Sequence, residues 1–435
     1  MILRSALPFW VEADLLRSRA TDALGLQNMA DVLADKILPG LSVLTTRARY
    51  FSFLCWVRNR LRRYDELPIH KWEVALAFAE AKCHPKDDRT AGQPGGDNSK
   101  CRYIGSRNIF NYLDNRDRAL RNPTVVFKNP AWRAYRPSMV SLGLIEDGSP
   151  WNLTETGQSL AREYEKAIRY RGRGITPLPD AACLSRISNG ERRILRTVIG
   201  LNRRRIQDGD STSLSVRRQF VCEVERRFGQ NIASLSPDSV LQRYERIRMR
   251  GQTDLQKALH AAVIWEWLSL GLNVIFVGWS LEVHAGESHR FMRSLILRLR
   301  LMPRNRLPTH LTSIDALTKP ETVGRALAAI RHALELLPDD HRVLFFGDDA
   351  YRAFEIGRRL LRDKSIALKG RVERFLRDLY ILHQQAKGDQ LWIVTGQSGN
   401  YKPALGPSLQ IPPSVQPHAY RLSAFGQIVR DLGGI

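Results

Sequence analysis

Residues 38–61 read LPGLSVLTTRARYFSFLCWVRNRL, a Pro-Gly turn followed by a helical pattern. Thr45 or Thr46 can cap this helix, because a threonine hydroxyl accepts a hydrogen bond from a free backbone N–H of the first turn. The apolar side chains then recur at the spacing of one helix face: Tyr50, Phe53, Leu54, Val57 and Leu61. The sequence therefore predicts a helix that begins near residue 47 and packs one face onto a core.

The first turn of this predicted helix carries Arg47 and Arg49. A helix N-terminus exposes unpaired N–H groups and the positive end of the helix dipole, so two arginines there would create an anion site suited to phosphate. The alternative is structural. A threonine caps the helix and the arginines pair with acids such as Asp31 and Asp35.

The same segment carries a family resemblance. The stretch from Leu24 to Leu33, the Pro-Gly turn with Arg-Ala-Arg-Tyr-Phe, Tyr103-Ile-Gly-Ser-Arg and Leu142-Gly-Leu-Ile-Glu resemble, in that order, an uncharacterised family of bacterial proteins. The resemblance covers about residues 20–165, and its Pro-Gly and Arg-Ala-Arg-Tyr-Phe portion is the most specific. It implies a gene context beside helicases and nucleases in phage-defence clusters, without supplying a mechanism.

Length and charge set the class of the protein. The chain has 435 residues, 43% of them hydrophobic, which is enough for two or three domains. Lys and Arg number 67 against 44 Asp and Glu, a net charge of +23. Such a surplus favours a polyanionic partner, nucleic acid first, because each neutralised phosphate releases condensed counterions.

Composition divides the chain into four consecutive parts. We expect a mainly α protein with small β hairpins, one of them at residues 391–400, and an α+β C-terminal part. The polar, Gly- and Pro-rich loop at 84–102 separates the first two parts. The expected domains are a helical N-terminal unit at 1–97, a winged-helix-like element at 98–170, a basic helical middle at 175–302 and an α+β domain at 303–435.

The winged-helix prediction rests on a helix, a short hairpin and a second helix. Asp147-Gly148 is a dipeptide that closes hairpins, and a helix follows from about Thr156. The groove-entering helix would come from residues 129–142 and begin only at Pro137, since proline is tolerated in a first turn. Its contacting side chains would be Arg133, Tyr135, Arg136 and Ser138. Winged helices also dock proteins, so this alternative stays open.

Residues 186–250 form the most basic region, with 15 arginines against 7 acids. The cluster Arg203, Arg204 and Arg205 stands at its centre. The surplus predicts a groove that holds a nucleic-acid backbone without reading its sequence. The alternative is a set of solvated helix faces whose arginines pair with nearby glutamates.

A metal-dependent nuclease is the alternative enzyme. Asp65 and Glu80 would hold Mg²⁺ and Lys82 would help to activate water. Such a core needs a strand at residues 73–82, whereas the alanine-rich composition there favours a helix.

Two further segments have metal-ligating residue types. Cys83 and His84 with Cys101 would bind zinc if a fourth ligand came from elsewhere. Glu282–His289 offers two histidines and two carboxylates, but it lacks the spacing of a zinc helix and suggests a polar surface loop. We expect no cofactor.

Cysteine usage and hydropathy indicate the compartment. Five widely spread cysteines make no disulfide framework, which suits a reducing cytoplasm. The apolar stretch at 258–283 contains Glu266 and is predicted to be a buried helix followed by a strand, rather than a membrane span. We expect a soluble, cytoplasmic protein.

These observations together predict a non-catalytic DNA-binding subunit of a bacterial phage-defence assembly. It would position enzymes encoded by neighbouring genes, such as a helicase or a nuclease. The alternatives are the Mg²⁺-dependent nuclease of Asp65, Glu80 and Lys82, and an RNA-binding scaffold subunit of a ribonucleoprotein complex.

Overall fold

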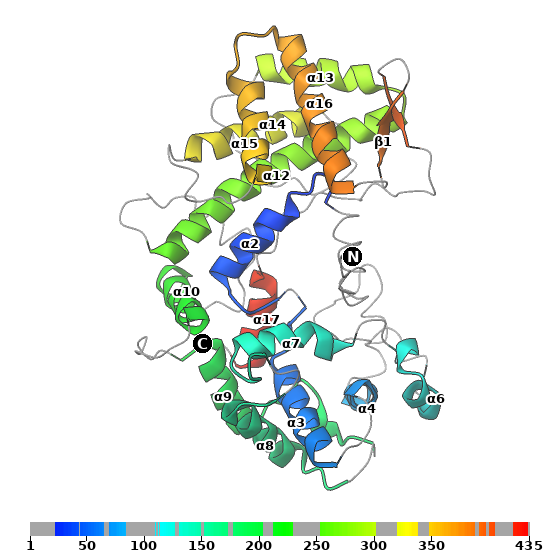
Figure 1. Ribbon diagram of the computed structural model, residues 1–435, viewed down its shortest axis with the longest axis vertical. Helices are drawn as coiled ribbons and strands as arrows, with labels where there is room; N and C mark the ends of the chain where they lie inside the picture. The colour runs from blue at the N-terminus through cyan, green and yellow to red at the C-terminus, as the bar shows by residue number, and fades with distance from the viewer. Residues whose placement is uncertain are drawn as a thin grey trace, which may run out of the picture. The chain divides into compact units, whose positions relative to one another are not determined.

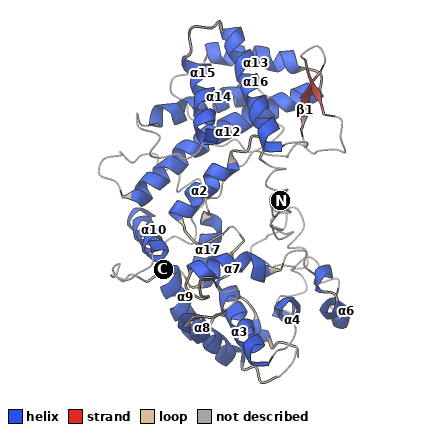
Figure 2. Ribbon diagram, in the orientation of Figure 1, coloured by secondary structure: helices blue, strands red, loops and turns tan. Residues whose placement is uncertain are grey.

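The described chain is mainly helical and carries one small antiparallel sheet, which confirms the predicted class (Figures 1 and 2). Strand β1 (Ile393–Thr395) lies within the predicted hairpin of residues 391–400, and its partner β2 (Tyr401–Pro403) follows directly after that range. The computed structural model describes residues 22–42, 44–64, 69–83, 109, 112, 114–126, 130–148, 152–172, 177–202, 212–228, 253–301, 320–337, 348–387, 391–396, 400–404 and 421–433.

The chain forms two compact units that alternate along the sequence. Unit 1 comprises residues 1–34 and 237–418, and unit 2 comprises residues 35–236 and 419–435. The boundary falls within helix α2 (Gln27–Ile37). The parts predicted from composition are consecutive, whereas each of these units draws on two separated stretches of chain.

Helix α3 (Ala48–Tyr64) is the centre of unit 2. Its apolar run from Tyr50 to Val57 is buried on all sides rather than on one face, because five helices surround it. The surrounding helices are α4 (Ile69–Cys83), α7 (Ala131–Ser141), α8 (Glu155–Ile168), α9 (Asn189–Ile199) and α17 (Leu422–Asp431). The other elements that the structure describes in unit 2 are α6 (Arg116–Arg121), the short 3-10 helices at Pro123–Val125 and Asp180–Ala182, and α10 (Thr212–Phe228).

Helices α7 and α8 flank the predicted hairpin, and the residues described between them form one antiparallel bridge, Ile145 to Leu153. Helix α8 begins with Thr154, whose hydroxyl accepts from the backbone N–H of Gly157. Helix α7 begins at Ala131, so the expectation that it starts at Pro137 is wrong. Pro137 lies inside the helix on its exposed side, where its ring meets solvent.

Unit 1 is built on α12 (Asp254–His284), a helix of 31 residues. The residues predicted as a strand in its second half continue the helix. The sequence did not reveal this, because a segment that is apolar on every side has no periodicity that distinguishes a helix from a strand. Gly271 allows the close approach of a neighbour, since a Cβ there would lie 2.7 Å from the carbonyl oxygen of Ala326. The helices packed on α12 are α13 (Ser288–Arg300), α14 (Pro320–Leu336), α15 (Asp348–Arg362) and α16 (Leu368–Lys387).

Helix α12 is long and apolar enough to cross a membrane, and 83% of its most apolar window is buried inside unit 1. Other helices of unit 1 cover it, as in the core helix of a soluble protein. This agrees with the prediction of a buried core helix.

Candidate nucleic-acid interface

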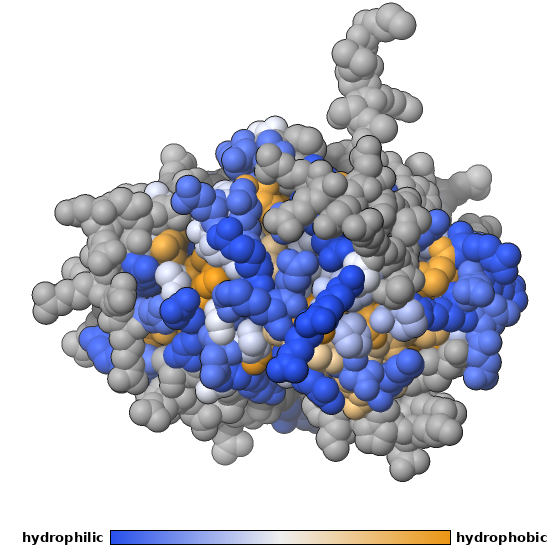
Figure 3. Space-filling view, turned by 90° about the horizontal axis from the view of Figure 1, so that it is seen from below, coloured by the Kyte–Doolittle hydropathy of each residue, from blue (hydrophilic) through white to orange (hydrophobic). Residues whose placement is uncertain are grey.

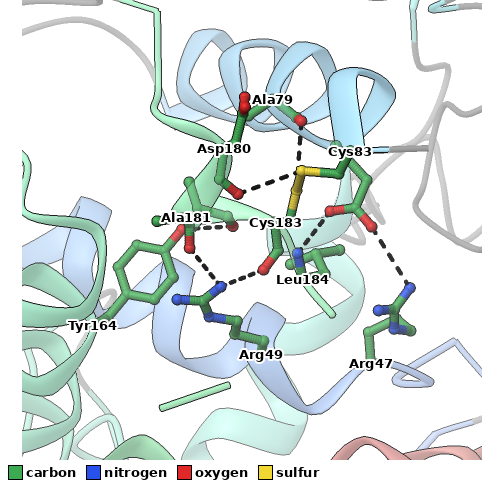
Figure 4. The surroundings of a disulfide bond; sticks show 11 residues. Arg47, Arg49, Ala79, Cys83, Tyr164, Asp180, Ala181, Cys183 and Leu184 are labelled. Atoms are coloured by element: carbon green, nitrogen blue, oxygen red, sulfur yellow. Dashed lines mark hydrogen bonds and ion pairs between the residues drawn. A yellow bond between two sulfur atoms is a disulfide. The ribbon is translucent and has the colours of Figure 1, made fainter. Parts of the chain in front are cut away.

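Arg49 lies in the first turn of α3 and is completely buried. Its guanidinium meets the carboxylate of Glu191 in α9 through two bonds, Nε to Oε1 at 3.1 Å and Nη2 to Oε2 at 3.3 Å. Nη1 donates to the carbonyl oxygen of Ala181 at 2.7 Å and also to that of Cys183. The guanidinium lies 4.9 Å from the ring centre of Tyr164 (Figure 4). Every face of the cation is therefore occupied by the protein.

Arg47 is held at the same helix end by a different acid. Its Nε donates to Oδ2 of Asp431 in α17 at 3.0 Å, and the same oxygen accepts from the backbone N–H of Ala48 at 3.0 Å. Burial opposes the charged form of Arg47, but the carboxylates of Asp431 and Glu80 outweigh it and raise the pKa of Arg47. Asp431 therefore accepts a hydrogen bond from a backbone N–H at the start of α3. Its negative charge is also stabilised there by the positive end of the helix dipole.

Neither predicted threonine cap is needed to explain the start of α3. The hydroxyl of Thr45 instead closes the preceding turn, donating to the carbonyl oxygen of Ser42 and accepting from its backbone N–H, both at 2.9 Å. The backbone N–H of Arg47 donates to the hydroxyl of Tyr135 at 2.9 Å.

These contacts correct the phosphate site predicted at Arg47 and Arg49. The structural alternative describes this helix end, with different acids from those expected. Asp35 pairs with Arg421, and the partners of the two arginines are Asp431, Glu80 and Glu191. A buried guanidinium requires such partners, because an isolated buried charge is strongly unfavourable.

A disulfide joins Cys83, at the end of α4, to Cys183 beside the Arg49 cluster (Figure 4). The expectation that the cysteines form no disulfide is therefore wrong for this pair. The two cysteines are 100 residues apart in sequence, so their spacing carries no local sign of the bond. Cys55 and Cys222 are free.

Only two of the four side chains predicted on the groove-entering helix are accessible. Tyr135 and Ser138 are buried on the inner face of α7, where Tyr135 packs on Tyr50 and Phe51, so this placement corrects their expected contact with DNA. Arg133 and Arg136 are half-buried on the outer side.

Two of the three predicted nuclease residues are described, Glu80 and Lys82, and their surroundings differ. Residues 73–82 belong to helix α4, so the strand that a nuclease core needs is not there. Glu80 is fully buried and accepts from the backbone N–H of Leu184 at 2.6 Å, whereas Lys82 is exposed. Asp65 lies outside the described residues.

The other predicted metal ligands are described only in part. Cys83 is bound to Cys183, and His84 and Cys101 lie outside the described residues. Residues 282–289 join α12 to α13. Within the described part of the chain, no group of three or more His, Cys, Asp or Glu is placed to hold a metal ion.

The basic region at 186–250 supplies the core as well as the surface. Arg217 of α10 is buried and donates to the carbonyl oxygens of Pro39 at 2.8 Å and Val198 at 3.1 Å. Burial and the neighbouring Arg218 lower the pKa of Arg217 to about 10. The cluster Arg203, Arg204 and Arg205 lies outside the described residues, and its contact with nucleic acid stays a prediction.

Exposed arginines occur in both units, for example Arg118, Arg162 and Arg193 in unit 2, and those of unit 1 include the arginines of α13 and α16. Helix α13 has four arginines and no acid. Arg290, Arg293 and Arg300 are exposed on one face, and no described carboxylate forms an ion pair with any of them, whereas Arg298 lies 3.7 Å from Glu321. The signal in the sequence was the lack of carboxylates three or four residues from Arg293 and Arg300, whereas Glu287 lies three residues before Arg290.

Helix α16 packs against both α13 and α15 and continues this basic character. Between Arg358 and Lys387 there are nine cations and three acids. Arg374 and Arg377 are exposed and have no ion pair with a described carboxylate, whereas Lys369 lies 3.8 Å from Glu373. We call α13 and α16 the basic helices of unit 1, because each carries exposed arginines that form no ion pair with a described carboxylate.

The face in Figure 3 shows how the described surface is composed. Its residues are mainly hydrophilic, and hydrophobic residues appear in separate patches between them. Comparisons with protein-family models, with curated proteins and with solved structures find no match for this chain. The resemblance carried by the Arg-Ala-Arg-Tyr-Phe segment therefore stays a prediction.

Proposed function

We propose that this protein binds nucleic acid, DNA first, through the basic helices of unit 1. The observation that carries this proposal is α13, where exposed arginines have no described carboxylate to neutralise them. Arginines of this kind attract phosphates and release counterions, and they contribute affinity without reading bases. The net charge of +23 gives the whole chain the same preference.

The proposed role is non-catalytic, as a subunit of a bacterial phage-defence assembly that positions helicase or nuclease partners. Helix α4 stands where a nuclease core would need a strand, which favours binding over cleavage. The arrangement of α7, the Ile145–Leu153 bridge and α8 supports a winged-helix-like element with a minimal wing. Arg133 and Arg136 are its candidate backbone contacts.

The test is a titration of a labelled DNA duplex, followed by fluorescence anisotropy over a range of salt concentrations. Arg293→Glu should weaken binding and reduce the steepness of the salt dependence by about one for each phosphate that the variant no longer neutralises. Lys257→Glu is the matched control. It makes the same charge reversal at an exposed residue of unit 1, and that lysine is paired with Asp254 at 3.5 Å.

Equal affinities and equal salt slopes for Arg293→Glu and Lys257→Glu would contradict the proposal. The same titration with an RNA duplex and an RNA strand tests the scaffold alternative, since tighter binding to RNA under identical salt would favour it. Copurification with the products of neighbouring genes tests the partners.

A further inference from the structure

Helices α15 and α16 of unit 1 enclose a groove of about 310 Å³. Its floor is apolar, formed by the buried side chains of Ile356 and Leu382. Two large hydrophobic side chains line it and remain exposed, Tyr351 at 45% and Ile381 at 41%. Ligand pockets begin at about 300 Å³, so the groove has room for one flat ring system rather than for a folded segment.

Polar groups stand at the rim of the groove beside this apolar floor. Nη1 of Arg352 donates to Oε1 of Gln385 at 2.8 Å, and a neutral amide is its acceptor. Arg359, further along α15, lies 3.9 Å from the carboxylate of Asp378. A ligand oxygen can replace the amide at Arg352 without leaving a carboxylate unpaired, so the groove has a cation available for an acceptor group.

An apolar floor, an exposed aromatic ring and a guanidinium with an amide at one edge match the chemistry of a nucleobase. A base has an apolar face that stacks on aromatic side chains and an edge of donors and acceptors. Phosphates on either side of it would meet arginines of the two helices. Arg359 lines the groove, and Arg362 and Arg374 are exposed on α15 and α16 outside its lining. Arg358 is paired at 2.6 Å with Glu355, which also lines the groove.

We propose that the groove between α15 and α16 binds an unpaired base of single-stranded nucleic acid, stacked on Tyr351, with the neighbouring phosphates held by arginines of the two helices. A base inside a duplex is stacked on both faces and does not reach such a groove. The inference rests on the proposed function and makes it specific. It assigns the binding of unpaired bases to this groove, and the binding of the phosphate backbone of single or double strands to α13.

The experiment compares binding of a labelled oligothymidylate strand and of a DNA duplex of equal length. Tyr351→Ala should weaken binding to the strand by about 5- to 150-fold, the range found when a stacking residue is removed, and leave duplex binding unchanged. Tyr351→Phe keeps the ring and should retain most of the affinity. Val32→Ala is the control, since Val32 is also an exposed hydrophobic residue of unit 1, at 42%.

Each outcome decides between distinct conclusions. If the wild-type protein binds neither strand nor duplex, the proposed function fails. If it binds both and Tyr351→Ala binds the strand as tightly as Val32→Ala does, this inference fails while the proposed function stands. Equal losses for strand and duplex, or an equal loss in Tyr351→Phe, also overturn it. The inference is also overturned if an acidic, apolar peptide binds the groove more tightly than the oligothymidylate strand does.

Discussion

Arg49 in unit 2 and Arg293 in unit 1 are the same residue type on helices of similar composition, and they have opposite roles. Arg49 is fully buried between Glu191 and two carbonyl oxygens, whereas Arg293 is exposed and has no ion pair with a described carboxylate. The count of 67 Lys and Arg is therefore not a count of exposed cations. The position of its carboxylate partners decides whether an arginine stabilises the fold or is available to a phosphate.

The largest effect should follow loss of the buried arginine. Arg49→Ala leaves Glu191 as an uncompensated buried charge, so we expect the free energy of unfolding to fall by about 3–5 kcal/mol. Denaturant unfolding monitored by circular dichroism measures it. Arg49→Lys should recover only part of the loss, because an ammonium cannot make the two parallel bonds to Glu191. If Arg49→Ala changed the free energy of unfolding as little as Arg293→Ala does, the two arginines would not differ in role.

The disulfide next to this cluster should come second. Replacing Cys83 and Cys183 together by alanine should lower the free energy of unfolding by about 2–4 kcal/mol, because the unfolded chain gains freedom. Adding dithiothreitol to the wild-type protein should produce the same shift. Cys222→Ala is the control, since Cys222 is exposed and free. Identical stability with and without the reductant would exclude the bond as a stabilising contact.

Glu73 extends the comparison to a buried acid that has no arginine. Its Oε1 accepts from the backbone N–H of Trp132 at 2.7 Å, and its Oε2 is buried without a partner among the described residues. Burial raises the pKa of Glu73 from 4.5 to about 8. Between these values the folded protein binds a proton that the unfolded chain releases, so stability should decrease as the pH rises, by at most about 1.4 kcal/mol per pH unit.

Glu73→Gln tests this behaviour because glutamine keeps the acceptor and does not titrate. The difference in unfolding free energy between the variant and the wild type should grow in favour of the variant from about pH 5 to about pH 8. A constant difference over this interval would show that Glu73 ionises normally in the fold.

The smallest effect on stability should come from the exposed arginine. Arg293→Ala should change the free energy of unfolding by no more than about 0.5 kcal/mol, as surface substitutions usually do. Its effect should appear in DNA affinity instead. A loss of stability comparable with that of Arg49→Ala would place Arg293 among the structural arginines and leave α13 without a binding role.

Helices were predictable wherever the signal was local. The apolar spacing from Tyr50 to Leu61 indicates α3, and the basic run at 290–300 indicates α13. The long helix α12 was only half recovered, because its apolar surface points in all directions and leaves no face to detect. Ser188 and Glu191 begin α9 with a capping box, another local signal.

The site was less predictable because its partners are distant in sequence. Glu191 is 142 residues from Arg49, and no local pattern reveals that the acid which caps α9 also neutralises an arginine of α3. The same holds for Tyr135, whose place in the core depends on contacts with α3. The charge counts showed which segments are rich in arginine, but they carried no information about which arginines would be exposed.

The bond between Arg47 and Asp431 makes the start of α3 depend on the order in which the chain is synthesised. Asp431 is 384 residues away from Arg47, so a ribosome makes the arginine long before its acid. At roughly 5–20 residues per second, the wait is on the order of tens of seconds. During that time Glu80 is the acid available to Arg47, and the helix end lacks the carboxylate that bonds both Arg47 and Ala48 until α17 has been translated.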